Sequence, residues 1–161
     1  RSSDQTIDFD IEVSKKRDAS NPVYYVQYAH ARICSILRKA APADLAAKAE
    51  SGEISMNELA HAIIPAHADL TGLTHPSEID LMRKMDGLQD LVASAARDRA
   101  AFRLTHYSQD LAGLFHAFYG NCHVITEDES LQNARLALID ATRIVLEISL
   151  GLLGISAPTK M

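Results

Sequence analysis

The sequence has little cysteine, glycine or proline, and these scarcities narrow the possible classes of protein. Its 161 residues include 2 cysteines, 7 glycines and 5 prolines. Cys34 and Cys122 have no partner in a Cys-X-X-Cys arrangement, which argues against a disulfide framework or a structural zinc site. We expect both thiols to be reduced and to lie in the core. Because helix-breaking residues are few, we expect a largely helical chain.

A long hydrophobic run and an excess of basic charge are also missing. No apolar stretch approaches the roughly 18 to 20 residues that a membrane span requires, and the first residues do not resemble a secretory signal, so we expect a cytoplasmic protein. The formal net charge is −5, whereas domains that coat nucleic acid usually carry a basic excess. Any contact with nucleic acid must therefore be local.

The usual local signatures of catalysis are absent too. The sequence contains no glycine-rich phosphate loop, no Gly-X-Ser-X-Gly elbow and no His-Glu-X-X-His pair. His61, His67 and His75 lie six and eight residues apart, which places them on no common helical face. The sequence therefore predicts neither a catalytic centre nor a metal site in this chain.

Three stretches have the apolar spacing of long amphipathic helices, with residues recurring at steps of three and four. The first is expected from Pro22, with Asn21 as its N-cap, to about residue 40. The second spans residues 99–119, and the third begins after an acidic opening at 126–129 and runs to about residue 151. The predicted buried stripes are Val23, Val26, His30, Ile33 and Leu37; Leu104, Tyr107, Leu111, Leu114 and Phe118; and Leu131, Ala134, Leu138, Ala141, Val145, Ile148 and Leu152.

Shorter elements fill the remainder. We expect a short helix within a long loop at residues 41–56, another from 58 to 64, and a loop at 66–74. A further helix should begin near Pro76 and break or bend at Gly87 before continuing toward Arg97. The predicted fold is therefore all-α, a helical bundle of three long helices plus shorter ones.

The first residues leave two alternatives open. Residues 6–13 alternate like a strand, yet their acidic side chains followed by three basic residues also suit a helix. On a strand, Asp8, Asp10 and Glu12 would share one face as a paired-carboxylate site. An ordinary solvated or salt-bridged edge is the competing interpretation.

Aromatic and basic residues gather at two places. Tyr25, Tyr28 and Arg32 step along one helical face, where two rings beside a guanidinium can hold an unstacked base and a phosphate. Tyr119 and His123 flank the end of the second long helix, where rings can also stack on bases. Both groups could instead complete the core. A third set of basic residues, either one phosphate-facing groove or a salt-bridged surface, is Arg97, Arg99, Arg103, Arg135 and Arg143.

Residues 21–32, Asn-Pro-Val-Tyr-Tyr-Val-Gln-Tyr-Ala-His-Ala-Arg, resemble the helix that opens the anticodon-binding domain of class I arginyl-tRNA synthetases. Residues 1–10 are similar to the passage out of that family's catalytic domain. Residues 134–138, 141–143, 152–154 and the final Met161 resemble the family's last helix and C-terminus. The resemblance implies a trailing segment of the catalytic domain at 1–18 and a helical anticodon-binding domain at 19–161.

For function, the resemblance implies a domain that grips the anticodon arm of arginine tRNA and distinguishes the middle cytosine of the anticodon. Its expected partners are this tRNA and its own catalytic domain, with no membrane or DNA. The full-length enzyme would ligate arginine to tRNA with ATP and Mg bound in the catalytic domain. Because motifs of the His-Ile-Gly-His and Lys-Met-Ser-Lys types are absent, this chain should hold no cofactor and be inactive alone.

Carried over by position, the resemblance places Tyr25 and Tyr28 near the anticodon arm and Tyr119 in the anticodon loop. Met161 would close the same pocket, and His123 stands where members have tryptophan or a basic residue. The complete set of expected tRNA-binding residues is Tyr25, Tyr28, Arg32, Tyr119, His123, Arg135 and Met161. The competing interpretation is a helical protein-interaction or structural module in which both aromatic clusters belong to the core.

Overall fold

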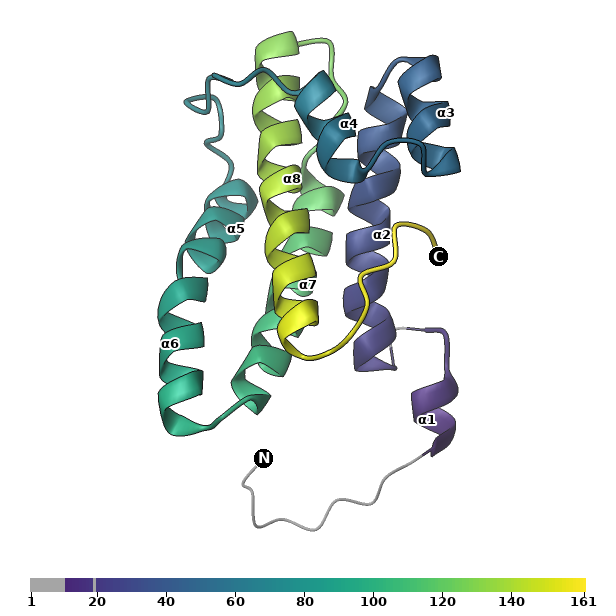
Figure 1. Ribbon diagram of the computed structural model, residues 1–161. Coiled ribbons are helices and arrows are strands. Elements are labelled where there is room, and N and C mark those ends of the chain that lie inside the picture. The colour runs from purple at the N-terminus through teal and green to yellow at the C-terminus, as the bar shows by residue number, and fades with distance from the viewer. Residues whose placement is uncertain (1–10, 19) are drawn as a thin grey trace.

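A computed structural model describes residues 11–18 and 20–161, and in these ranges every regular element is a helix (Figure 1). The elements are α1 (Ile11–Lys15), α2 (Pro22–Ala40), α3 (Ala43–Ser51), α4 (Met56–Ile63), α5 (Pro76–Asp86), α6 (Leu88–Asp98), α7 (Phe102–Asn121) and α8 (Glu129–Leu152). The three longest correspond to the three predicted amphipathic stretches. The expected all-α bundle of three long helices plus shorter ones is therefore confirmed.

The start of α2 follows from two adjacent residues. The Asn21 side chain accepts hydrogen bonds from the backbone N–H groups of Val23 at 3.1 Å and Tyr24 at 3.4 Å. Pro22 occupies the first helical turn, where its missing N–H has no helical partner to lose. The cap and the proline together fix the point at which the chain enters the bundle.

α2, α7 and α8 pack against one another, and α5 packs against both α7 and α8. In Figure 1, α5 and α6 lie on one side of α8, and α2 and α3 lie on the other. Side chains with no exposed area at the centre of the core are Ile33, Leu37, Leu111, Phe115 and Leu146. Cys34 and Cys122 are free and buried in the same core, as expected.

The segment between α2 and α5 forms two short helices and a loop. α3 ends at Gly52, whose φ of 82° is in the left-handed region that favours glycine. α4 begins with a capping box, in which Glu58 N–H donates to the Ser55 hydroxyl at 3.2 Å and Ser55 N–H donates to the Glu58 carboxylate at 2.7 Å. Both helices pack against α2.

Gly87 separates α5 from α6, as the sequence predicts. At the start of α5 the His75 ring accepts from the N–H of Ser77 at 3.2 Å, and the Glu78 carboxylate accepts from the N–H of His75 at 2.8 Å. Glu78 is only 1% exposed, and Arg135 of α8 pairs with it at 2.7 Å. An ion pair thus joins the beginning of α5 to α8.

Two of the predicted stripes need correction. Val23 is 42% exposed, because it lies in the first turn of α2, where the bundle ends. In α8, Ile148 and Leu152 are 47% and 53% exposed. The buried face of this half of the helix instead includes Thr142 and Ser149. Because both side chains carry a hydroxyl, a search for apolar spacing does not find this face.

Hydrogen bonds within α8 allow these two hydroxyls to be buried. The Thr142 hydroxyl donates to the Leu138 carbonyl at 2.9 Å, and the Ser149 hydroxyl donates to the Leu146 carbonyl at 3.0 Å. A hydroxyl bonded to its own helix can enter a core without leaving an unpaired polar group. The apolar spacing alone therefore placed the buried face on the wrong side of the second half of α8.

Arg143 is the largest side chain of the core. It is 2% exposed, and its guanidinium contacts Asp140 at 2.8 Å, Glu147 at 3.0 Å and the side-chain oxygen of Asn57. Asn57 belongs to α4, so this cluster joins α4 to α8. Because a buried guanidinium needs such partners to offset its lost hydration, the cluster is expected to matter for stability.

His30 is a second buried titratable group, 1% exposed, on α2. Its Nδ1 lies 2.9 Å from the Pro158 carbonyl, and its Nε2 has no hydrogen-bond partner among the described residues. Burial lowers the pKa of His30 below its ordinary value of 6.5, with Arg143 acting in the same direction and Pro158 and Glu147 against it. The unfolded chain therefore binds the proton more readily, so stability is full above pH 6.5 and declines as the pH falls through the folded pKa.

We expect His30→Asn to reduce this loss of stability in acid. The measurement is urea unfolding at about pH 7.5 and about pH 5, on either side of the pKa of free histidine. The free energy of unfolding of the wild type should decrease more between these conditions than that of the variant. His61→Asn, at an exposed position, serves as the control. Equal decreases in the wild type and His30→Asn would contradict the assignment.

Part of the predicted N-terminal segment lies outside the described residues, including Asp8 and Asp10 of the possible carboxylate site. Glu12 belongs to α1 and pairs with Lys15 at 3.3 Å. In the described ranges no helix is both long and apolar enough to cross a membrane.

Candidate RNA-binding surface

One face of α2 presents the aromatic and basic residues singled out by the sequence. Tyr25 is half-buried, and its ring centroid lies 4.9 Å from that of His116 on α7. Tyr28 is 39% exposed, and its ring lies 5.9 Å from the same histidine. Burial, and then the positive charge of Arg32, lower the pKa of His116, which favours an uncharged ring between the two tyrosines. Tyr25 therefore supports the surface, while Tyr28 is open to a ligand.

Arg32 joins this face of α2 to the end of α7. Its guanidinium donates a hydrogen bond to the Tyr119 hydroxyl at 2.8 Å, and its central carbon lies 4.8 Å from the centroid of the Tyr119 ring. Tyr119 also stacks on Phe115 at 6.1 Å and remains 37% exposed. The structure thus brings together two residues that are 87 positions apart in the sequence.

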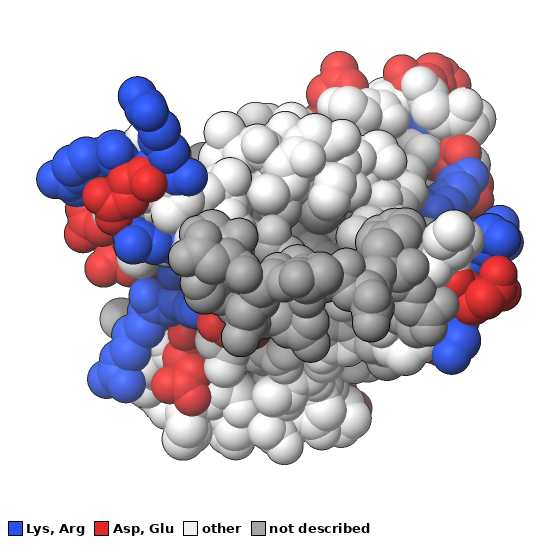
Figure 2. Space-filling model, turned by 90° about the horizontal axis from the view of Figure 1, so that it is seen from below, with Lys and Arg blue, Asp and Glu red and all other residues white. Residues whose placement is uncertain are grey.

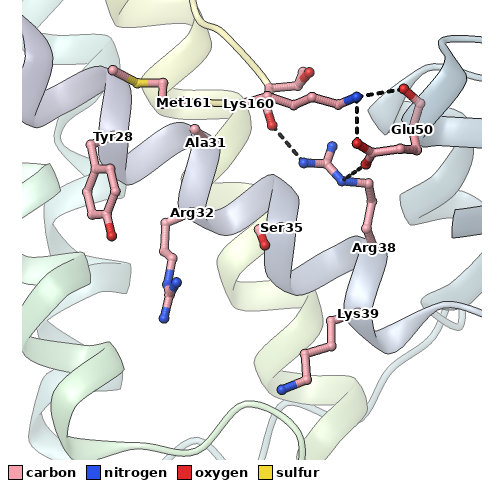
Figure 3. Close-up of a pocket in the computed structure, with 10 residues that line it drawn as sticks. Tyr28, Ala31, Arg32, Ser35, Arg38, Lys39, Glu50, Lys160 and Met161 are labelled. Atoms are coloured by element: carbon pink, nitrogen blue, oxygen red, sulfur yellow. Dashed lines mark hydrogen bonds and ion pairs between the residues drawn. The ribbon is translucent and has the colours of Figure 1, made fainter.

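A cavity of about 590 Å³ opens beside these residues (Figure 3). Its lining comprises Tyr28, Ala31, Arg32, Ser35, Arg38, Lys39, Glu50, Thr159, Lys160 and Met161. Figure 3 shows Tyr28, Arg32 and Lys39 pointing to the same side of α2, with Met161 above Tyr28. Met161 and Tyr28 therefore line the same cavity.

The cavity is locally basic although the chain is acidic. Four of its lining side chains carry positive charge, and Glu50 is the one acidic side chain among them. Glu50 forms ion pairs with Arg38 at 3.2 Å and with Lys160 at 2.6 Å. Lys39 forms no ion pair among the described residues, and the partner of Arg32 is a neutral hydroxyl. Arg32 and Lys39 are thus available to an anion such as a phosphate.

Two smaller cavities extend this surface. One, of about 430 Å³, is lined by Tyr24, Tyr25, Tyr28 and His116. The other, of about 270 Å³, is lined by Ile36, Lys39, Tyr119, Cys122, His123, Val124 and Ile125. Tyr28 also lines the large cavity, as does Lys39, so the three cavities are neighbours along α2. Among the predicted residues, Tyr25, Tyr28, Arg32, Tyr119, His123 and Met161 all line part of this surface.

Arg135 lies near this surface but is held by the protein itself. Its NH1 donates to the His123 carbonyl at 2.7 Å, and its Nε donates to the buried Glu78 carboxylate at 2.7 Å. Only 14% of the side chain is exposed. The observed geometry makes Arg135 a support for the backbone at His123, which is itself exposed.

The structure does not gather the five arginines into one phosphate-facing groove. Figure 1 places the α6–α7 connection, with Arg97 and Arg99, at the opposite end of the molecule from the start of α8, with Arg135. Arg103 pairs with Asp98, and Arg143 is buried. Figure 2, viewed onto the α6–α7 end, shows basic and acidic side chains interleaved at two sides of this face. The prediction of such a groove is therefore wrong. For Arg103, the alternative of a salt-bridged surface is correct.

Four basic lining residues of the surface had no role assigned from the sequence: His116, Arg38, Lys39 and Lys160. Lys39 could have been found by continuing the helical face from Arg32 in steps of three and four through Ser35. Lys160 and His116 could not, because their positions depend on how distant segments pack. In the described part of the chain no cluster of three or more histidine, cysteine or acidic side chains could hold a metal ion.

The chain is similar to known proteins over its whole length. The family model described as the DALR anticodon binding domain matches residues 26–161. Arginine–tRNA ligases of Heliobacterium modesticaldum and Desulforamulus reducens are each 45% identical over the whole chain, which spans 27% and 26% of their lengths. The solved structure of Thermus thermophilus arginyl-tRNA synthetase, 30% identical, superposes with a TM-score of 0.74 over 98% of this chain and 24% of its own. The chain therefore belongs to the DALR anticodon binding domain family, of the type that arginyl-tRNA synthetases carry.

Proposed function

We propose that this chain binds the anticodon arm of arginine tRNA and discriminates the middle cytosine of the anticodon. The observation that carries the proposal is the pairing of Arg32 with Tyr119 beside a basic cavity that also contains Tyr28 and Met161. Single-stranded RNA is commonly held by bases stacked on aromatic or guanidinium planes, with cations on the phosphates. This surface offers both kinds of group in neighbouring cavities.

The polar partner of Arg32 favours a role in binding. The hydrogen bond from Arg32 to a neutral hydroxyl can be exchanged for a stronger, charge-assisted one to a phosphate. That exchange would free the Tyr119 ring for a base. Lys39, which lines both neighbouring cavities, can follow the phosphate backbone between them. His123 would add a weaker contact at the outer edge, and Arg135 would act by holding the His123 backbone.

The chain spans about a quarter of the length of the curated relatives it matches, so the complete activity belongs to a longer protein. We assign residues 19–161 to the anticodon-binding domain and residues 1–18 to a segment leading from the catalytic domain. In the full-length cytoplasmic enzyme that catalytic domain would bind ATP and Mg and ligate arginine to tRNA. The present chain would recognise the tRNA and place it, and would be inactive alone.

The test is the affinity of the 161-residue chain for an arginine anticodon stem-loop, compared with the same stem-loop carrying a different middle base. A preference for cytosine that persists across a salt series would support the proposal, because base contacts depend less on salt than phosphate contacts. Equal and strongly salt-dependent binding of both RNAs would overturn the discrimination. Absence of binding to either would favour the alternative, a helical interaction or structural module.

A further inference from the structure

The last 7 residues of the chain, 155–161, form a segment without regular secondary structure that we call the C-terminal strap. In Figure 1 it leaves α8, turns and passes alongside α2. Its last three residues, Thr159, Lys160 and Met161, all line the 590 Å³ cavity. The position of the strap therefore determines the shape of the proposed RNA site.

The two halves of the strap are held in different ways. In the first half, Ile155 and Ala157 pack against the core, and Ile155 N–H donates to the Leu150 carbonyl at 2.9 Å. The three cavity residues at its end are exposed. Apolar packing therefore helps to anchor the beginning of the strap, and polar contacts along its length must place the end that meets the ligand.

Those polar contacts come mainly from α2. Gln27 donates to the Ser156 carbonyl at 2.8 Å, the His30 Nδ1 lies 2.9 Å from the Pro158 carbonyl, and Arg38 donates to the Thr159 carbonyl at 2.8 Å. Because a carbonyl only accepts, the Nδ1 of His30 must carry the hydrogen. Three side chains of one helix thus bond three carbonyls of the strap in the same order along both segments.

Two of these side chains stand apart from the RNA surface. Arg38 lines the cavity itself, so its loss would also remove charge from the site. Gln27 lines none of the three hollows, and His30 is 1% exposed beneath the strap. Neither can influence a ligand in the cavity by direct contact, but both can do so through the strap.

We propose that Gln27 and His30 are positioning residues for RNA binding, which hold the strap so that Thr159, Lys160 and Met161 form one wall of the site. The proposal deepens the proposed function and rests on it. It separates two classes of α2 residue: those that face the RNA, such as Tyr28 and Arg32, and those that act through the strap.

The experiment compares Gln27→Leu and His30→Leu, which lack the donor, with His30→Asn, whose amide can donate from near the Nδ1 position. Gln109→Leu is the matched control, since Gln109 is a half-buried glutamine on α7 that forms no hydrogen bond to the strap in the described part of the chain. Each chain is labelled with ¹³C at its 4 methionine methyl groups, and the NMR signal of Met161 reports the strap. Binding of the anticodon stem-loop is measured with the same samples, and melting temperatures confirm the fold.

We expect Gln27→Leu and His30→Leu to weaken RNA binding by roughly two- to tenfold, the equivalent of one hydrogen bond. Both should move the Met161 signal toward that of an unstructured methionine. His30→Asn should retain more affinity and a more native signal than His30→Leu, and Gln109→Leu should match the wild type.

Three results would overturn the proposal. If the wild type binds RNA and both leucine variants bind equally well, the strap proposal fails while the proposed function stands. If affinity decreases but the Met161 signal does not move, the two residues act by another route. If the wild type binds no RNA, the proposed function fails, and the positioning role fails with it.

Discussion

Replacing Tyr119 by alanine is expected to weaken binding of the arginine anticodon stem-loop by about 1–3 kcal/mol, the range for losing one stacked base. The ring is 37% exposed at the end of α7, and the Arg32 guanidinium lies 4.8 Å from its centroid. Alanine removes the stacking surface and also the hydroxyl that orients Arg32. Isothermal titration with the stem-loop measures the effect.

Tyr119→Phe separates the ring from the hydroxyl. If a base stacks on Tyr119, the phenylalanine variant should retain most of the affinity, because its ring still packs on Phe115 and under Arg32. A loss as large as that of Tyr119→Ala would instead assign the effect to the orientation of Arg32. Unchanged affinity of Tyr119→Ala with an intact fold would remove Tyr119 from the site.

Replacing Arg143 by alanine is expected to lower the free energy of unfolding by roughly 3–5 kcal/mol, the usual cost of removing one partner from a buried ionic cluster. Arg143 is 2% exposed and contacts Asp140, Glu147 and Asn57. Its loss would leave Asp140, which is 17% exposed, without its cation and would open space between α4 and α8. Denaturant unfolding monitored by circular dichroism measures the change.

Arg83→Ala is the matched control for Arg143→Ala. Arg83 is 78% exposed and lies 4.0 Å from Asp80, and exposed pairs of this kind contribute about 0–1 kcal/mol. The control should therefore unfold almost like the wild type. Similar stabilities for the two variants would mean that solvent replaces the buried guanidinium without cost, contrary to the role assigned to the cluster.

Local sequence features predicted the helices well because helix limits depend on neighbouring residues. The cap at Asn21, the proline after it and the break at Gly87 act over a few positions, and each lies where it was predicted. The steps of three and four along α7 identified a face whose five members are buried or half-buried. The same reasoning placed Tyr25, Tyr28 and Arg32 together on α2.

The same approach was wrong where a polar side chain has a distant or hidden partner. The buried face of α8 contains Thr142, Arg143 and Ser149, and apolar spacing treats each as a surface residue. Arg135 stays a predicted tRNA contact, but residue type did not reveal its ion pair with the buried Glu78, 57 positions away. Residue type alone cannot distinguish a guanidinium that awaits a ligand from one already satisfied within the protein.

The sequence by itself determined the all-α class, the limits of the long helices and, through its resemblance to a family, which residues are predicted to bind tRNA. Only the tertiary structure decided that Arg32 meets Tyr119, that the strap lies along α2, and that Arg143 is buried. The physical reason is distance along the chain. Hydrogen bonds and caps within a helix join residues a few positions apart, whereas the site depends on contacts such as Gln27 with Ser156, 129 positions away, which form only when the bundle packs.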